Sequence, residues 1–209
     1  PLDIGAIGLR YPLFVKPAHA GDSLGIDAKS LVHDAAALDA QVAAMRREYG
    51  DVLVEEYIAG RELTVLVLAS PEENGKATAL APVEYLFPPG SAFKTYAFKT
   101  SDLHPEANVP LRDEALAARA KDVAVRMFRG FGGVGYARMA FRVDAEGNLF
   151  FLEVNFTCSV FYADGYEGSA DFILKFDPMG QAGFAAHIIG EGIARHRRAQ
   201  KPFVVRGNA

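Results

Sequence analysis

A lysine at the end of an apolar run is the first residue whose surroundings could handle a phosphorylated ligand. Lys16 follows the run Tyr11–Val15, read as a buried strand, and precedes the small, polar, glycine-containing loop Ala18–Gly25. Its ammonium group would supply charge, and backbone N–H groups can approach a polyphosphate closely where glycines lack side chains. Ser23 could add a hydroxyl donor. The sequence has no Walker loop, so the alternative is an ordinary strand-end lysine before a turn.

A second apolar run leads directly into carboxylates. The predicted strand Val52–Val54 continues into Glu55 and Glu56, and Glu62 follows after a short connector. The backbone of such a segment can hydrogen-bond an adenine edge, and Glu62 could accept hydrogen bonds from ribose hydroxyls. The alternative is a solvated strand end that carries surface glutamates.

A third group of polar residues lies on a predicted β-hairpin, whose strands run from 134 to 143 and from 149 to 155. Glu153 and Asn155 are two residues apart on one strand and therefore share a face. If the strands pair with Val143 opposite Asn148, Arg138 lies opposite Glu153.

The same register places Ala140 beside Arg138 and Glu153. The neighbours of Glu153 along the strand are apolar, so we expect a half-buried carboxylate that needs a cation. Either Arg138 or a hard metal ion with oxygen ligands could supply the positive charge. The alternative is a structural Arg138–Glu153 pair that only closes the sheet.

A long segment, Phe87–Val109, has no clean period and contains three prolines, several aromatic residues, Lys94 and Lys99. Loops of this length inside compact domains are often active-site lids. A cationic loop could close over phosphates and exclude water.

The remaining sequence predicts the elements that would position these residues. Apolar periodicity and capping residues indicate helices at 34–47, 113–129 and 180–198. Further strands are expected at 63–69 and 77–86, and residues 156–178 are expected to be mostly loop. The two halves of the chain meet near residues 58–62.

Composition indicates a folded protein. Of the 209 residues, half are apolar and 23% are charged, which excludes disorder. The net charge of −4 and the scattered basic residues do not favour nucleic-acid binding. No apolar run approaches the length of a membrane-spanning helix. Cys158 is the single cysteine, which excludes an intrachain disulfide and fits a reducing, cytoplasmic location. The first residue is a proline, which leads us to expect that an upstream portion is absent.

The order of these motifs resembles the ATP-grasp superfamily and, within it, the D-alanine–D-alanine ligase branch. The matching segments are YPLFVKPAHAGDSLGID, DVLVEEYIAGRELTVLVL, PPGSAFKTYAFKT and GGVGYARMAFRVDAEGNLFFLEVN. The resemblance implies an α+β fold in which two lobes grip a nucleotide between antiparallel sheets. Residues 1–58 would be part of the central lobe and residues 59–209 the C-terminal lobe, including a lid loop at 87–109. The family's N-terminal lobe would be missing.

The resemblance also implies roles in nucleotide binding. Lys16 resembles the lysine that binds the α- and β-phosphates of ATP, and Glu62 resembles the ribose-binding glutamate. Glu55 resembles the residue that takes the adenine amino group, and the hinge around the base would consist of Glu56, Tyr57 and Ile58. Ser23 occupies the matching position in the glycine loop, and Lys99 aligns with the lid lysine that reaches the phosphates.

The implied activity is an ATP-dependent carboxylate–amine ligase that acts through an acyl phosphate on small-molecule substrates such as amino acids. Arg138 resembles the arginine that stabilises the acyl phosphate and the tetrahedral intermediate. Glu153 and Asn155 resemble ligands of Mg²⁺ (or Mn²⁺). Nucleic-acid and membrane partners are not expected, and family habit favours a homodimer.

Two departures from the family pattern limit this reading. Ala140 stands where the ligases have a metal-binding aspartate, so the metal site has lost a carboxylate. The segment Phe156–Tyr162 lacks the Pro-Gly loop that receives the second amino acid, which predicts an acceptor other than plain D-alanine. The alternative function is therefore a non-catalytic module that binds ATP or ADP.

Overall fold

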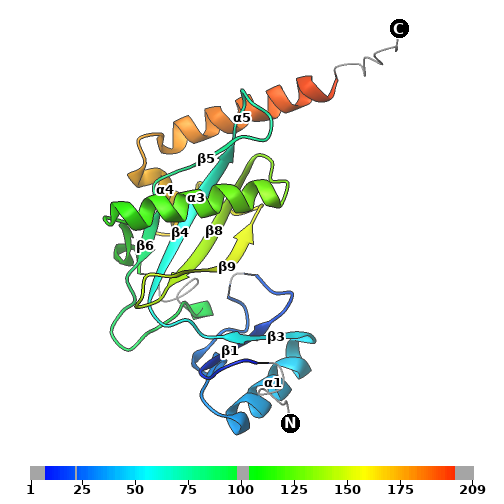
Figure 1. The fold of residues 1–209 in the computed structure, drawn as a ribbon, viewed down its shortest axis with the longest axis vertical. Coiled ribbons are helices and arrows are strands. Elements are labelled where there is room, and N and C mark those ends of the chain that lie inside the picture. Colours follow the sequence, from blue (N-terminus) through cyan, green and yellow to red (C-terminus); the bar gives the residue numbers. More distant parts are fainter. Residues whose placement is uncertain (1–7, 22, 98–103, 201–209) are drawn as a thin grey trace. The chain divides into compact units, whose positions relative to one another are not determined.

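The computed structural model describes residues 8–200 except residues 22 and 98–103. Contacts divide the chain into two compact units (Figure 1). The first comprises Pro1–Gly60 with Phe87–Ala107, and the second comprises Arg61–Leu86 with Asn108–Ala209. Each unit contains an antiparallel sheet and at least one helix.

The first unit is built on a three-stranded sheet of order β2-β1-β3. Its elements are β1 (Leu13–Pro17), a 3-10 turn (Ala28–Ser30), β2 (Leu31–Val32), α1 (Ala35–Tyr49), β3 (Val52–Glu56) and a 3-10 turn (Pro105–Ala107). The carboxylate of Asp34 caps α1 by accepting from the N–H of Ala37, and Gly50 ends the helix with φ +81°. Alternate strand residues such as Leu13 and Val15 pack against α1 and form the core of this unit.

The opposite face of this sheet carries Phe14, whose ring Phe93 helps to cover. The ring of Phe93 meets that of Phe14 edge-on with the centroids 4.9 Å apart, and the hydroxyl of Tyr57 donates to the carbonyl of Ala92 at 2.7 Å. These contacts group the segment Phe87–Ala107 with the first unit, whereas the sequence prediction placed loop 87–109 in the second.

The second unit contains a six-stranded sheet in the order β7-β6-β4-β8-β9, with β5 paired to β4. Its strands are β4 (Arg61–Ala69), β5 (Ala77–Ala79), β6 (Val83–Tyr85), β7 (Asn108–Pro110), β8 (Tyr136–Val143) and β9 (Leu149–Asn155). Its helices are α3 (Glu114–Gly130), α4 (Ser169–Phe176) and α5 (Gly180–Ala199). The helices predicted at 34–47, 113–129 and 180–198 are confirmed.

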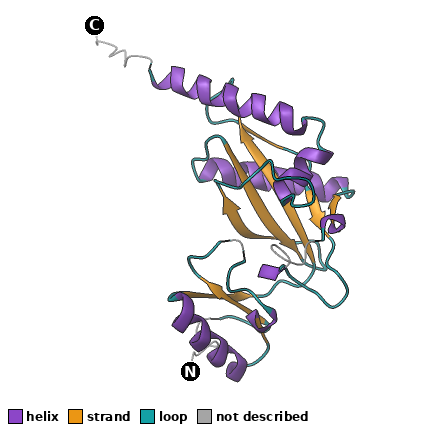
Figure 2. Cartoon of the chain, turned by 180° about the vertical axis from the view of Figure 1, so that it is seen from behind, coloured by secondary structure: helices purple, strands orange, loops and turns teal. Residues whose placement is uncertain are grey.

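Helices cover both faces of this sheet. On β4, Leu63, Val65 and Val67 point toward α3, while Leu66 and Leu68 point toward α4 and α5. Accordingly, α3 lies in front of the sheet in Figure 1 and behind it in Figure 2. Because side chains alternate, the odd-numbered positions of β8 join the α3 core and its even-numbered positions lie on the other face.

One predicted strand was wrong. Residues 77–86 form two short strands instead of one, and Pro82, which has no N–H to donate, lies in the break between them. Residues 156–178 are mostly loop, as predicted, but they also contain helix α4, which is too short to show a clear period in the sequence. Its residues Ala170–Leu174 are buried.

The predicted hairpin register was also wrong. Val143 pairs with Leu149 instead of Asn148, because Asn148 belongs to the turn. There its backbone N–H and side-chain amide donate to the carboxylate of Asp144 at 2.7 and 2.9 Å. An Asx-type turn of this kind fixes where the strands begin to pair.

A β-bulge changes the register again further along the hairpin. Between Ala140 and Phe141 the partner on β9 changes from Glu153 to Phe151, so Leu152 has no partner opposite it. The extra residue lets Phe151 lie on the α3 face, as the partner of Phe141, while Glu153 lies on the opposite face. Without the bulge these two residues would share a face.

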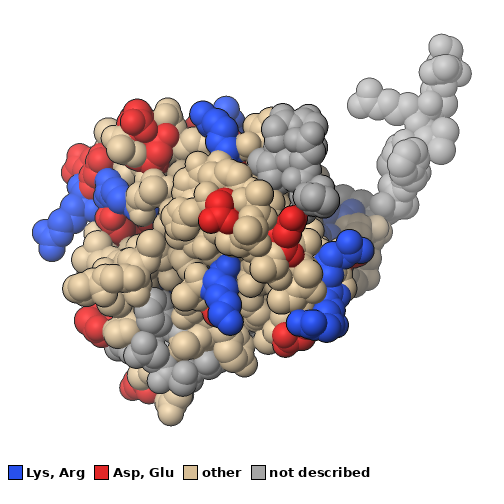
Figure 3. Space-filling view, turned by 90° about the horizontal axis from the view of Figure 1, so that it is seen from below, with Lys and Arg blue, Asp and Glu red and all other residues tan. Residues whose placement is uncertain are grey.

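Along the described ranges, no helix has the length and apolar character that a bilayer crossing requires. On the face drawn in Figure 3, basic and acidic side chains are interspersed instead of gathered by sign.

Candidate functional site

The first unit holds Lys16 and Glu55 in direct contact. Lys16 Nζ lies 2.6 Å from Glu55 Oε1, and both side chains are partly buried. They come from neighbouring strands, on the sheet face opposite α1, because Lys16 pairs with Leu53 and Glu55 is two residues further along β3. Two residues with separately predicted roles therefore form one charged pair.

One position in the loop after Lys16 can be occupied only by glycine. Gly25 has φ +76°, and a Cβ there would lie 2.9 Å from both Pro17 Cγ and Tyr49 Cε2. Ser23 also has a positive φ of 58°, which is strained for a residue with a side chain. Turn hydrogen bonds from Leu24 N to Gly21 O and from Ile26 N to Ser23 O hold this shape.

The residues predicted to form the hinge are fixed within the first unit. Arg10 donates to the Glu56 carboxylate from its backbone N–H and from its guanidinium at 2.9–3.2 Å, and this lowers the pKa of Glu56. Tyr57 donates its N–H to Pro12 O at 2.9 Å. Ile58 follows and is half-buried. The Glu56 side chain thus faces Arg10.

Glu62 lies at the start of β4 in the second unit and pairs with Arg142 of β8. Their nearest side-chain atoms are 3.4 Å apart, and only 11% of the Glu62 side chain and 4% of the Arg142 side chain are exposed. Sequence reasoning missed Arg142. The signal was present, because Arg138, Ala140 and Arg142 alternate with apolar residues and must share one face of a strand.

Arg138 and Glu153 form the predicted ion pair despite the changed register. Arg138 Nη2 lies 3.1 Å from Glu153 Oε1, although their strand partners are Asn155 and Ala140. The side chain of Glu153 is 56% exposed and that of Arg138 is 18% exposed. The Glu153 carboxylate is therefore somewhat more exposed than the half-buried group that the sequence predicts.

Oxygen donors suited to Mg²⁺ are present beside this pair, but they are few. Glu153 offers a carboxylate and Asn155 a side-chain carbonyl, which accepts from the N–H of Thr157 at 2.9 Å. Ala140, opposite Glu153, adds no donor. Among the residues that the structure describes, no three His, Cys, Asp or Glu side chains are grouped as a metal site.

The loop after Asn155 is anchored by buried groups. Asp171 accepts hydrogen bonds from the N–H of Phe161 at 2.6 Å and of Gly168 at 3.1 Å. The hydroxyl of Tyr136 donates to the carbonyl of Cys158 at 3.0 Å. Burial raises the pKa of the Cys158 thiol, which disfavours its reactive thiolate form. Lys99, the predicted lid lysine, lies outside the described residues.

A family model described as "D-ala D-ala ligase C-terminus" matches residues 6–161, the segment that contains all of the charged pairs described above. This chain belongs to the D-Ala–D-Ala ligase family. The match confirms the predicted family. The matched segment includes β8 and β9, the strands that carry Arg138, Glu153 and Asn155.

Curated relatives agree with this assignment. The chain is 39% identical over 142 residues to D-alanine–D-alanine ligase of Nocardia farcinica, and the aligned region covers 66% of the chain and 38% of the relative. It is 32% identical over 202 residues to D-alanine–D-alanine ligase A of Mesorhizobium japonicum, and the aligned region covers 92% of the chain and 52% of the relative. This family member thus spans about half the length, or less, of these relatives.

Solved structures confirm the α+β ATP-grasp fold. The VanG D-Ala:D-Ser ligase of Enterococcus faecalis matches with a TM-score of 0.67 and 25% identity, over 90% of this chain and 51% of that one. The D-alanine–D-alanine ligase of Bacillus anthracis, solved with ATP, matches in fold with a TM-score of 0.64 and 19% identity, over 95% of this chain and 57% of that one.

Proposed function

We propose that this chain is the ATP-binding and catalytic part of a carboxylate–amine ligase that joins small D-amino acids. The family match and relatives named as D-alanine–D-alanine ligases support this proposal. The observation that carries it is the group formed by Arg138, Glu153 and Asn155 on one sheet face inside the matched segment. We assign the first unit to the central lobe and the second to the C-terminal lobe.

The reaction would proceed in two transfers. A substrate carboxylate oxygen attacks the γ-phosphorus of ATP. The bond between the γ-phosphorus and the bridging oxygen of the β-phosphate breaks, which releases ADP and forms an acyl phosphate. The amine of the second substrate attacks the acyl carbon, loses a proton and displaces phosphate. The protein contributes positioning and electrostatic stabilisation instead of forming a covalent bond.

The charged pairs suggest how each residue would contribute. The Lys16 ammonium neutralises α- and β-phosphate charge, and its contact with Glu55 holds it in place. The Arg138 guanidinium, oriented by Glu153, stabilises the oxyanion that forms when the amine attacks. Glu62, held by Arg142, accepts from the ribose hydroxyls. Lys99 and Ser23 would contact the phosphates.

Glu153 and Asn155 fit one hard cation through their oxygen atoms. Mg²⁺ (or Mn²⁺) bound there would neutralise phosphate charge. Because Ala140 offers no side-chain oxygen, we propose a weaker metal site than one with a carboxylate at this position.

A specific observation favours a second candidate, a module that binds ATP or ADP without catalysis. The position opposite Glu153 is an alanine, 8% exposed, and provides no metal-binding carboxylate. The altered segment Phe156–Tyr162 is consistent with either this module or a ligase whose acceptor is not D-alanine. We also keep the predictions, made from the sequence, that the protein is cytoplasmic and forms a homodimer.

Amino-acid-dependent ADP release separates the two candidates. This chain and any longer native form would be assayed with Mg·ATP and a panel of D- and L-amino acids and dipeptides. A ligase releases ADP only with a particular carboxylate–amine pair, and Lys16→Ala or Glu153→Ala should lower that rate at least about 100-fold. The control Lys29→Ala removes an exposed lysine of the same unit and should change little. ADP binding without any release would favour the module.

A further inference from the structure

A pocket of about 570 Å³ lies within the second unit, where β4 ends and before β8 begins. Its walls come from the β4–β5 turn, the last turn of α3, the glycine-rich segment 130–134 and the second half of α5. Figure 1 shows the β4–β5 turn beside the second half of α5. None of the residues assigned above to ATP, metal or catalysis lines this pocket.

The lining of this basic pocket is strongly cationic in a chain whose net charge is −4. The cationic side chains are Lys76, Arg126, Arg129, Arg195 and Arg198. Glu191 is the single carboxylate among the lining residues, all of which are described. Its side chain is only 3% exposed, and Arg195 Nε lies 3.2 Å from one of its oxygens, so its charge is already matched.

Two of the other cations also have carboxylate partners just outside the pocket. Lys76 pairs with Glu73 at 2.7 Å, and Arg126 pairs with Asp122 at 3.0 Å.

Arg129 and Arg198 are left without a carboxylate partner among the described residues. Arg198 donates instead to the carbonyl of Pro71 at 3.0 Å. The pocket therefore carries about two positive charges that no carboxylate of the described residues balances, and this favours the binding of an anion.

Neutral hydrogen-bond donors complete the lining. Ser70 Oγ accepts from the N–H groups of Glu72 and Glu73 at 3.2 and 3.1 Å, which leaves its hydroxyl hydrogen available to donate. The side-chain amide of Asn74 also lines the pocket. A substituent at Gly133 would lie 2.6 Å from the ring of Phe128, so the wall there must stay bare backbone.

We propose that the basic pocket binds a small molecule or ion that carries a phosphate group. Guanidinium groups form paired hydrogen bonds to phosphate oxygens, and four of the five cations are arginines. A phosphate monoester has a charge of about −2 at neutral pH, which matches the two unbalanced cations. The cavity volume lies in the range of small-molecule sites.

Calorimetric titration of the whole chain with inorganic phosphate and, separately, with ribose 5-phosphate tests this site. The double variant Arg129→Gln/Arg198→Gln should weaken binding at least about tenfold, because each substitution removes a charge-assisted contact. The matched control is Arg197→Gln, since Arg197 is exposed on the same helix, adjoins Arg198 and does not line the pocket. It should change affinity by less than about twofold.

The outcomes separate this site from the nucleotide site and from general charge effects. Tighter binding of ribose 5-phosphate would assign the pocket to a phosphorylated metabolite, and equal affinities would assign it to free phosphate. If Arg197→Gln weakened phosphate binding as much as the double variant does, the proposal would be overturned, because the affinity would then depend on net charge alone. Loss of binding in Lys16→Ala, with the double variant unaffected, would also overturn it by placing the phosphate elsewhere. The two calorimetric titrations measure binding directly and do not depend on ligase turnover.

Discussion

Ala140 is the residue that most limits the chemistry on the large sheet. It lies opposite Glu153 on the face that also carries Arg138, so a carboxylate at this position would adjoin both a cation and a second carboxylate. The neighbouring Arg138 would stabilise the charged form of an aspartate there. This aspartate would add a further oxygen ligand to those of Glu153 and Asn155.

We therefore expect Ala140→Asp to lower the Mg²⁺ concentration needed for half-maximal nucleotide binding by about tenfold. Fluorescence titration of a nucleotide analogue at several Mg²⁺ concentrations measures this. Ala140→Leu introduces a side chain of similar size without an oxygen atom, and should leave the metal dependence nearly unchanged. Identical curves for Ala140→Asp and the parent chain would mean that another residue already fills this role.

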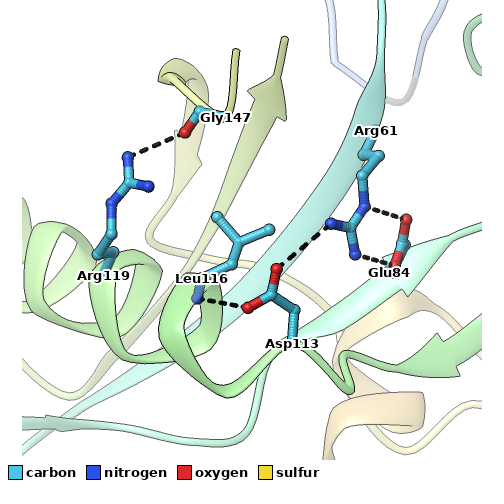
Figure 4. A network of polar contacts seen from close by, with 6 residues as sticks. All are labelled: Arg61, Glu84, Asp113, Leu116, Arg119 and Gly147. Carbon is cyan, nitrogen blue, oxygen red and sulfur yellow. Dashed lines mark hydrogen bonds and ion pairs between the residues drawn. The ribbon is translucent and has the colours of Figure 1, made fainter. Parts of the chain in front are cut away.

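At the scale of elements, polar contacts anchor α3 to the sheet, as Figure 4 shows. The carboxylate of Asp113 accepts from Leu116 N at 3.0 Å and lies 3.9 Å from Arg61, which itself binds Glu84 through two contacts of 2.7 Å. Nearer the middle of the helix, Arg119 donates to a carbonyl in the β8–β9 turn at 2.9 Å. These contacts orient the helix whose apolar face fills the core.

Loss of the Asp113 cap should reduce stability by about 1 kcal/mol in Asp113→Ala, because an N–H of the first turn loses its acceptor. Urea unfolding measures the free energy of unfolding. Asp113→Asn keeps the cap but removes the charge, so it should retain most of the stability. If both variants lose the same amount, the ion pair with Arg61 matters and the cap does not.

The Glu62–Arg142 pair should stabilise the junction of β4 and β8 only while both partners are present. Arg142→Met removes the buried cation that lies 3.4 Å from the Glu62 carboxylate and should cost about 3 kcal/mol of unfolding free energy. Glu62→Leu/Arg142→Met removes both charges and should recover most of that loss. Urea unfolding of the two single variants and the double variant gives the coupling, and additive losses would show that the two charges do not interact.

At the scale of the whole molecule, an ion pair between residues 46 positions apart makes stability depend on pH. Arg10 lowers the pKa of Glu56 below its ordinary value of 4.5, so the native state binds fewer protons than the unfolded chain near that pH. The stabilisation is fully present above the unfolded pKa and is lost as pH falls through the lower, folded pKa.

Arg10→Gln should therefore be less stable than the parent chain at pH 7, and the difference should shrink as the pH falls below about 4.5. Unfolding by urea at a series of pH values measures the difference. Arg47→Gln, which removes an exposed arginine of the same unit, is the control. A difference that stays constant down to pH 3 would contradict a role for Glu56 ionisation.

Much of this protein could be predicted from sequence, because many of the signals are local. The helix with Asp34 as its cap and Gly50 after its end follows from residues a few positions apart. The shared face of Glu153 and Asn155 follows from strand alternation alone. The order of the motifs identified the family before any contact was known.

The tertiary structure alone decided which distant residues meet. The hairpin register depended on Asn148 joining the turn and on the bulge before Phe141, and neither changes the apolar pattern of the strands. The partner of Glu62 and the cations of the basic pocket come from segments far apart in the chain. Periodicity and capping report the conformation of neighbouring residues, whereas register, buried ion pairs and pockets depend on long-range packing, which a single sequence does not display.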